Sequence, residues 1–269
     1  MPVHRLSDLT SGRLDPYRHL RTSNLTRVSG RFIAESKPLV QRLVASGITI
    51  DSFLIDESYL EEAIGWLPPE IDLFSIPGPY VSELIGFAFH RGYLACGMRP
   101  DLQPLERGDF ELTSSWLGAM LVGLQDPENM GSILRTCTAL GISDVLIGPE
   151  CVDPFARRVL RVSMGNAFKL RFFEAMDPLS TMGLCSEIGI ESIAACLSET
   201  SEELSQFRRN GPGLVVLGNE AHGLPLEILQ AATRSVRIDM AMGTDSLNVS
   251  VAAGIILHNL SRVCGNRID

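Results

Sequence analysis

The spacing of hydrophobic positions predicts a small α/β domain in the first part of the chain. Helical spacing covers 38–44, 59–66 and 81–87, whereas alternating or extended apolar segments cover 32–34, 48–55 and 92–96. Apolar residues three to four positions apart are typical of amphipathic helices, and alternation is typical of half-buried strands. Residues 1–31 are polar and weakly periodic, so we expect an arm or a short helix there. A polar linker at Arg107–Asp109 ends this first domain.

The pattern changes after Trp116 and predicts a parallel α/β sheet. Apolar strands at 119–124, 144–148, 190–195, 213–217 and 235–239 alternate with helices at 129–140, 154–164, 178–187, 225–232 and 247–263. Strands that alternate with helices indicate a parallel sheet covered on both faces. We therefore predict two domains, residues 1–108 and residues 109–269.

Composition is that of a globular protein with reduced cysteines. The 269 residues are 45% hydrophobic and 20% charged. No run of 18 apolar residues occurs, and MPVHRLSDLTSGRLD has no apolar core, so we expect neither a membrane span nor a secretory signal. The six cysteines are far apart and form no CxxC pair, which argues against a zinc or redox site and favours a cytoplasmic protein. We predict no metal.

Charge is unevenly distributed. The net charge is −9, which argues mildly against a nucleic-acid partner, yet residues 1–31 hold six arginines against Asp8 and Asp15. Residues 153–171 hold five basic residues against Asp153 alone, so each segment has a balance of +4. Arginine binds phosphate bidentately and stacks on bases, although an arginine-rich genome would produce the same bias. The RNA-binding candidates are Arg18, Arg21, Arg27, Arg31, Arg157, Arg158 and Arg161.

A first segment with candidate chemistry runs from Leu124 to Arg135, from a strand end into a helix. Asn129 is placed to cap that helix, and Arg135 follows six residues later. Gly131 costs helix propensity, which predicts the close approach of another backbone. An ordinary strand–turn–helix with an asparagine cap would give the same pattern.

A second segment, Leu214–Pro225, is a buried strand that ends in a loop between Gly218 and Gly223. Glu220 follows the carboxyl end of this strand, where open α/β sheets bind ligands. The alternative is a plain turn before a helix that starts near Pro225. No second His or Cys is spaced to join His222, so we expect an exposed loop histidine there.

A third segment, Ile238–Gly254, passes from a strand through a glycine-containing loop into a helix of small and apolar residues. Its run Ala252–Gly254 permits very close packing against another element. Ser246 is a plausible N-cap, so Asn248 in the first turn needs another explanation for its polarity.

Together the three segments resemble the motifs of the SpoU (TrmH) family of SPOUT methyltransferases. The pattern Asn-x-Gly-x-x-x-Arg occurs as Asn129, Gly131 and Arg135, Leu-Gly-Asn-Glu-x-x-Gly-Leu at 217–224, and Ser-Leu-Asn-Val-Ser-Val-Ala at 246–252. All three occur in the family's order, and the resemblance covers residues 117–263. Residues 30–100 resemble more loosely the family's ribosomal-protein-like domain. There Ser36 stands where glycine is usual, and Asp239 stands where the third motif often has proline.

The resemblance implies a fold, a cofactor and a partner. The fold would be the SPOUT α/β knot, a trefoil-knotted parallel sheet with helices on both faces, preceded by a small α/β substrate-binding domain. A homodimer would methylate a ribose 2′-hydroxyl of tRNA or rRNA, with active sites that combine residues of both subunits. The knot would form the S-adenosylmethionine pocket from Leu217, Gly218, Asn219, Gly223, Ile238, Met240, Ser246 and Leu247.

The catalytic residues that the resemblance implies are Asn129, Arg135, Glu220, Ser246 and Asn248. Since arginine stays protonated in proteins, we interpret Arg135 as a cation that stabilises the developing alkoxide and holds the adjacent phosphate, not as a base. Asn129 would orient the ribose or Arg135. Glu220 would orient the nucleophile or balance charge near the sulfonium.

Two alternative functions remain. The first is a non-catalytic RNA-binding protein that retains the fold; the presence of all five polar motif residues argues against it. The second is a nicotinamide-dependent enzyme, but no GxGxxG follows the first strand of either domain.

Overall fold

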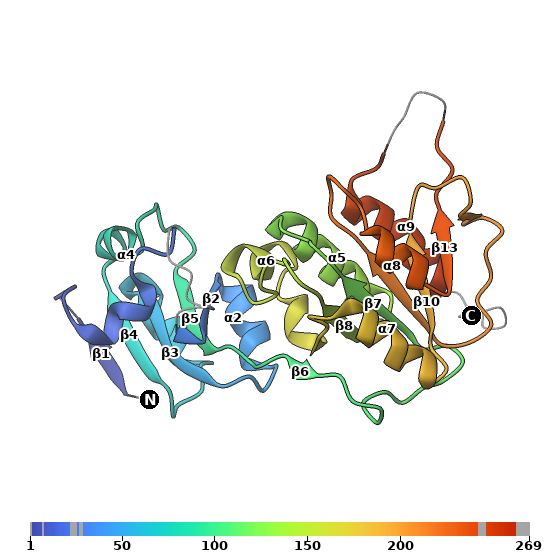
Figure 1. The fold of residues 1–269 in the computed structure, drawn as a ribbon. Coiled ribbons are helices and arrows are strands. Elements are labelled where there is room, and N and C mark those ends of the chain that lie inside the picture. Colours follow the sequence, from blue (N-terminus) through green and yellow to red (C-terminus); the bar gives the residue numbers. More distant parts are fainter. Residues whose placement is uncertain (1, 7, 22–25, 27–28, 242–245, 262–269) are drawn as a thin grey trace, which may run out of the picture. The chain divides into compact units, whose positions relative to one another are not determined.

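The computed structural model describes residues 2–6, 8–21, 26, 29–241 and 246–261. The chain forms two compact units, residues 1–101 with 153–168, and residues 102–152 with 169–269 (Figure 1). The predicted boundary at residue 108 therefore needs a correction, because the prediction placed 153–168 in the second domain. Those residues belong with the first unit because Phe155 and Phe168 stack on Phe32, with ring centroids 5.5 and 5.7 Å apart.

The first unit contains a five-stranded mixed sheet in the order β1-β4-β3-β5-β2. Its strands are β1 (Val3–Arg5), β2 (Arg31–Glu35), β3 (Ile50–Asp56), β4 (Asp72–Ile76) and β5 (Tyr93–Met98). Strands β1, β4 and β3 are parallel to one another, and β5 is antiparallel to β3 and β2. The helices are η1 (Gly12–Tyr17), α2 (Lys37–Val44), η2 (Glu57–Tyr59), α3 (Leu60–Ile64), α4 (Gly78–Ile85) and α6 (Arg157–Val162).

Of the two alternatives predicted for the amino-terminal segment, the short helix is present as η1, whereas a free arm is wrong for the described residues. Strand β1 pairs with β4, and the side chains of Leu14 and Tyr17 are fully buried in the same core as α4. The Tyr17 hydroxyl also lies 2.9 Å from Ser52 Oγ on β3. A strand of three residues is too short to show an alternating pattern. The polar, arginine-rich sequence therefore did not indicate that this segment contributes a strand to the sheet.

The second unit contains an eight-stranded sheet in the order β11-β13-β10-β12-β7-β8-β9-β6, and every pairing in it is parallel. The strands are β6 (Gln103–Pro104), β7 (Leu117–Leu121), β8 (Asp144–Ile147), β9 (Arg171–Glu174), β10 (Glu191–Ala195), β11 (Glu202–Glu203), β12 (Gly213–Leu217) and β13 (Arg234–Arg237). The helices are α5 (Pro127–Ala139), α7 (Pro178–Glu187), α8 (Leu226–Ala231) and α9 (Val249–Ser261). Helix η3 (Asn166–Lys169) begins in the first unit and ends at Lys169, where the chain returns to the second unit.

Helices cover both faces of this parallel sheet. On one face Leu214 and Val216 of β12 pack in a cluster with Met182 of α7 and Ile228 of α8. Because successive strand residues point to opposite faces, the equally buried Val215 and Leu217 point to the other face, where α9 contacts β12 and packs on α5. This confirms the predicted parallel α/β architecture. The knot depends on the path through 242–245, which lies outside the described residues, and stays a prediction.

Candidate functional site

The loop after β12 is closed on itself and tied to the neighbouring strand. Asn219 and Gly223 exchange two backbone hydrogen bonds of 3.0 and 2.9 Å. The Asn219 side chain accepts hydrogen bonds from the amides of Ala221 and His222, and its Nδ2 donates to the Gly123 carbonyl at 2.8 Å. Since Gly123 follows β7, one asparagine fixes the loop over two adjacent strand ends.

This loop conformation requires glycine at position 218. A Cβ atom on Gly218 would lie 2.5 Å from the Gly223 carbonyl carbon and 2.6 Å from the Leu224 nitrogen. Both are backbone atoms that no rotamer change can move away. Gly218 is therefore required by packing inside the loop itself.

Three of the predicted catalytic residues form one hydrogen-bonded chain. Asn129 Nδ2 donates to Glu220 Oε1 at 3.0 Å, and Asn248 Nδ2 donates to Asn129 Oδ1 at 2.9 Å. Asn129 is only 8% exposed, so its amide orientation is fixed between two partners. The contacts join α5, the loop after β12 and the start of α9, which are distant in sequence.

Two predicted helix caps are wrong. Asp126 caps α5 by accepting a hydrogen bond from the Glu128 amide at 3.0 Å, so Asn129 lies inside the first turn. At α9 the Asn248 Oδ1 accepts from the Ser250 amide at 2.9 Å, so Asn248, not Ser246, occupies the cap. The side-chain oxygen of an N-cap residue accepts a hydrogen bond from a backbone amide in the first turn of the helix. Near the start of each of these helices, the sequence has two side chains that could do so. The structure thus explains Asn248: its oxygen caps α9 and its nitrogen holds Asn129.

A pocket of about 520 Å³ lies at the carboxyl ends of β10, β12 and β13. Its lining includes all eight residues predicted to bind cofactor: Leu217, Gly218, Asn219, Gly223, Ile238, Met240, Ser246 and Leu247. The structure adds residues 195–198, which follow β10, and Val249, Ala252 and Ile256 of α9. Sequence reasoning missed residues 195–198, although the end of the adjacent parallel strand was the available signal.

A second hollow, of about 900 Å³, lies on the other side of the same loop. It is lined by Gln125, Asp126 and Asn129 of the first motif and by Pro149 and Glu150 after β8. Residues 219–224 line both spaces. Glu220 therefore belongs to the wall between the pocket and the hollow.

Arg135 is not brought to the other motif residues within one chain. It is exposed on α5 and lines neither of the two spaces. The other arginines described in this unit are engaged by carboxylates or carbonyls: Arg107, Arg171, Arg208, Arg209, Arg234 and Arg237. Within the described part of the second unit, Arg135 and Lys169 are the basic residues without such a partner.

The Cys151 thiol, which lies near the site, is not acidic. Burial raises the pKa of the Cys151 thiol to about 11, so it stays protonated at neutral pH and is a poor nucleophile. Among the described residues no three His, Cys, Asp or Glu side chains are grouped to hold a metal ion. No helix in the described ranges is long and apolar enough to cross a membrane.

The predicted RNA-binding arginines differ in how they are held. Arg18 bonds Asp15 and local carbonyls, Arg31 lies 3.5 Å from Asp51, and Arg157 lies 2.6 Å from Glu35 and 4.6 Å from the centroid of the Phe87 ring. Arg21, Arg158 and Arg161 are exposed, and Arg27 lies outside the described residues. Arg18, Arg31 and Arg157 therefore serve contacts inside the first unit.

Charge separates the two units. The first has thirteen basic and thirteen acidic residues, and the second has ten basic and nineteen acidic residues. The entire formal charge of −9 therefore belongs to the second unit, and the first is neutral.

Comparison with known proteins identifies the family. A parallel sheet with a pocket at its carboxyl strand ends defines a ligand-binding α/β protein. The model of the SpoU rRNA methylase family matches residues 117–258, and the chain belongs to that family. It is an RNA methyltransferase, as the motifs predicted.

Similar proteins match between two thirds and nearly the whole of the chain. An uncharacterized tRNA/rRNA methyltransferase of Mycobacterium bovis is 31% identical, over 97% of this chain and 93% of its own. The 23S rRNA (guanosine-2′-O-)-methyltransferase RlmB of Acinetobacter baylyi is 27% identical, over 68% of this chain and 75% of its own. The AdoMet-bound rRNA methyltransferase from Sinorhizobium meliloti has the same fold, with a TM-score of 0.83, 23% identity, and coverage of 96% of this chain and 97% of that one.

Proposed function

We propose that this protein transfers a methyl group from S-adenosylmethionine to a ribose 2′-hydroxyl of rRNA or tRNA. The observation that carries the proposal is the Asn248–Asn129–Glu220 chain of hydrogen bonds in the wall between the pocket and the hollow. Methyl transfer requires the donor, bound in the pocket, and the acceptor, bound in the hollow, to come into contact at this wall. The names of the relatives, a tRNA/rRNA methyltransferase and a 23S rRNA (guanosine-2′-O-)-methyltransferase, support the RNA substrate.

The pocket residues fit S-adenosylmethionine. Leu217, Ile238 and Leu247 supply apolar surface for an adenosine, and the strand-end backbone groups around Gly218 supply hydrogen bonds. Glu220 supplies a negative charge on the same lining. When bound, the cofactor supplies a methyl group on a cationic sulfonium, which a nearby carboxylate stabilises.

The second hollow is our proposed place for the target nucleoside. Glu220, oriented by Asn129, would hold the 2′-hydroxyl proton, and Asn248 would keep Asn129 in that orientation. Positioning of this kind accounts for a large part of the rate when the nucleophile is weak. Ser246 would support the third motif loop at the rim of the pocket.

Arg135 supports a homodimer. An unpaired cation outside its own chain's pocket can serve catalysis if it reaches the site of a second copy. Helix α9, which packs on α5, also exposes Val251 (50%) and Ile255 (41%), which lie one turn apart. We propose that α5 and α9 form the dimer interface, and that the dimer works in the cytoplasm, where its RNA is found.

Methyl transfer to RNA tests the function. With radiolabelled S-adenosylmethionine and total RNA, the wild-type protein should label ribose 2′-oxygens, and Arg135→Lys should lose most of that activity while staying folded. Lysine keeps the charge but lacks the planar fork that holds two oxygens together. Arg107→Lys, an exposed exchange at the Glu187 pair, is the matched control and should keep its activity. Absence of labelling by the wild type would instead favour the non-catalytic RNA-binding alternative.

A further inference from the structure

One arginine outside the motifs binds the backbone of three separate segments. Arg209, in the loop before β12, donates hydrogen bonds to the carbonyls of Trp116 (2.8 Å), Gly211 (2.6 Å) and Leu260 (2.8 Å). Its remaining bonds go to Ser114 and Ser115, at 3.3 and 2.7 Å. All five acceptors are carbonyl oxygens and none is a carboxylate, so the guanidinium serves as a backbone connector.

The segments that Arg209 joins lie at the amino ends of the strands, whereas the pocket lies at their carboxyl ends. Trp116 and Gly211 precede β7 and β12, and Leu260 lies in the last turn of α9. The last carbonyls of a helix lack intrahelical partners and carry partial negative charge, so a cation there satisfies and stabilises them. Arg209 therefore fixes the carboxyl end of α9 to the amino ends of two central strands.

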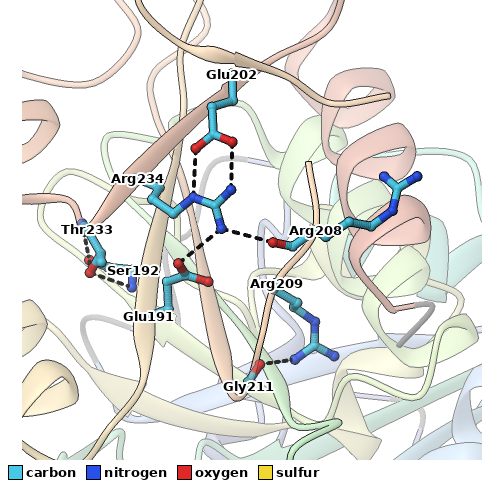
Figure 2. Close-up of polar contacts among 8 residues, drawn as sticks. All are labelled: Glu191, Ser192, Glu202, Arg208, Arg209, Gly211, Thr233 and Arg234. Atoms are coloured by element: carbon cyan, nitrogen blue, oxygen red, sulfur yellow. Dashed lines mark hydrogen bonds and ion pairs between the residues drawn. The ribbon is translucent and has the colours of Figure 1, made fainter. Parts of the chain in front are cut away.

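A second arginine holds the Arg209 loop in place. Arg234 forms two bonds with Glu202, of 2.7 and 2.6 Å, and a third bond of 3.3 Å with Glu191, as Figure 2 shows. The same guanidinium donates to the Arg208 carbonyl at 2.9 Å and lies 3.8 Å from the centroid of the Phe207 ring. The loop that carries Arg209 is thus bonded to β10, β11 and β13 next to the point where Arg209 contacts α9.

The other end of α9 belongs to the proposed active site. Asn248 caps the helix and holds Asn129, and Val249, Ala252 and Ile256 line the pocket. A helix transmits an axial shift along its length because each turn is bonded to the next. Fixing Leu260 therefore fixes the depth at which the pocket-lining side chains and Asn248 are held.

We propose that Arg209 is a positioning residue for methyl transfer, which keeps α9 in register with the sheet so that the cofactor pocket and the Asn248–Asn129 contact are preformed. This inference rests on the proposed function, because one of its tests measures the affinity for S-adenosylmethionine. The position of α9 can also be tested by amide hydrogen exchange, which needs no cofactor. None of the three sequence motifs includes Arg209.

The test compares Arg209→Met with Arg171→Met in the full chain. Arg171 bonds Asp144 at the same end of the strands, at 2.7 Å, and forms no hydrogen bond with the described part of α9. Its loss leaves the buried Asp144 carboxylate without this counter-charge, so the variant shows the effect of destabilising that end of the sheet without releasing α9. Calorimetric titration with S-adenosylmethionine, below the melting temperature of both variants, should give a dissociation constant raised about tenfold for Arg209→Met and unchanged for Arg171→Met. Amide hydrogen exchange over residues 249–261 should accelerate in the first variant alone.

Each outcome decides the proposal. If Arg209→Met does not fold, Arg209→Lys, which keeps a cation but fewer donors, should raise the dissociation constant about threefold. An unchanged dissociation constant in a folded Arg209 variant overturns the proposal, whether or not its melting temperature falls. If the wild type itself fails to bind S-adenosylmethionine, the proposed function fails, and unchanged exchange over 249–261 would separately overturn the register of α9.

Discussion

Ser36 has backbone angles that residues with side chains avoid. Its φ is 101° and its ψ is 149°, a region occupied almost only by glycine, and its side chain makes no capping hydrogen bond to α2. Ser36→Gly should relieve this strain and raise the free energy of unfolding by about 1 kcal/mol, after the greater entropy of glycine in the unfolded chain is allowed for. Urea unfolding of the two proteins measures the difference.

Ser186→Gly is the matched control for that prediction. Ser186 is exposed in the helical part of α7, where glycine costs about 0.5–1 kcal/mol relative to alanine and less than that relative to serine. The two exchanges make the same chemical change and should have opposite signs. If Ser36→Gly destabilises the protein as Ser186→Gly does, Ser36 is not strained.

The pair Asn129 and Glu220 offers an exchange test of the catalytic network. Asn129→Asp removes the donor to Glu220 and places two carboxylates about where the 3.0 Å bond was, while its Oδ1 can still accept from Asn248. Activity should fall at least about tenfold, because a lost charge-assisted hydrogen bond is worth about 1.5–3 kcal/mol. Steady-state methyl transfer measures this loss.

Adding Glu220→Gln to Asn129→Asp restores a donor and an acceptor in the reverse sense. The double variant should regain folding stability relative to Asn129→Asp, with a coupling of about 1 kcal/mol, but not full activity, because Glu220's charge is gone. No coupling in the cycle would mean that the two side chains do not interact in solution.

Sequence predicted which residues form this network but not how they do so. The resemblance to the family motifs implied Asn129, Glu220 and Asn248, yet the local sequence assigned the caps to Asn129 and Ser246. A cap is decided by backbone geometry over one or two residues, and Asp126 and Asn248 offered equally suitable oxygens. Arg209 could not be found at all, because its partners are carbonyls, which every residue has.

At the scale of elements, the loop after β12 depends on a contact between two of its own glycines. Gly218→Ala must push the Gly223–Leu224 backbone away, since the new Cβ would approach within 2.5 Å. We expect a folded protein whose affinity for S-adenosylmethionine falls at least about tenfold, equal to about 1.4 kcal/mol, measured by calorimetry.

Gly183→Ala provides the control at the same scale. Gly183 is inside α7, has no atom within 4 Å of an added Cβ, and keeps a negative φ. Alanine there should stabilise the helix by about 0.5–1 kcal/mol and leave cofactor affinity unchanged. Equal losses of affinity in both variants would point to a general effect of the added methyl group and not to the loop.

Elements with a clear apolar pattern were predictable and those without one were not. Helices α5, α7 and α8 and strands β8, β10 and β12 lie within a few residues of their predicted places. Strand β11 was missed because two residues show no usable alternation, and β9 was missed because only Phe172 and Phe173 are apolar, between the charged Arg171 and Glu174. Strand β4 was missed although its five residues are mostly buried.

At the scale of the whole molecule, an acidic protein must still hold a polyanion. Deleting residues 1–30, which would suit a free arm, would remove β1 and the buried Leu14 and Tyr17, so it would unfold the first unit instead of testing RNA binding. Because the first unit has no net charge and the second unit has a net charge of −9, the first unit is the better surface for RNA. Point substitutions are therefore required.

Arg21 and Arg161 are exposed and have no partner in the described part of the first unit, whereas Arg157 pairs with the buried Glu35 at 2.6 Å. Each phosphate contact that is lost should lower the slope of log affinity against log salt by about 0.7–0.9. Arg21→Gln with Arg161→Gln should therefore flatten the slope by about 1.4–1.8 without changing the melting temperature. Arg157→Gln should instead lower the melting temperature and leave the salt slope unchanged, because it leaves Glu35 with only Arg91, 3.6 Å away, as a counter-charge.

RNA titrations over a range of salt concentrations, with a thermal melt of each variant, measure both quantities. A slope that stays unchanged in the double variant would place the RNA contacts on other residues of the protein.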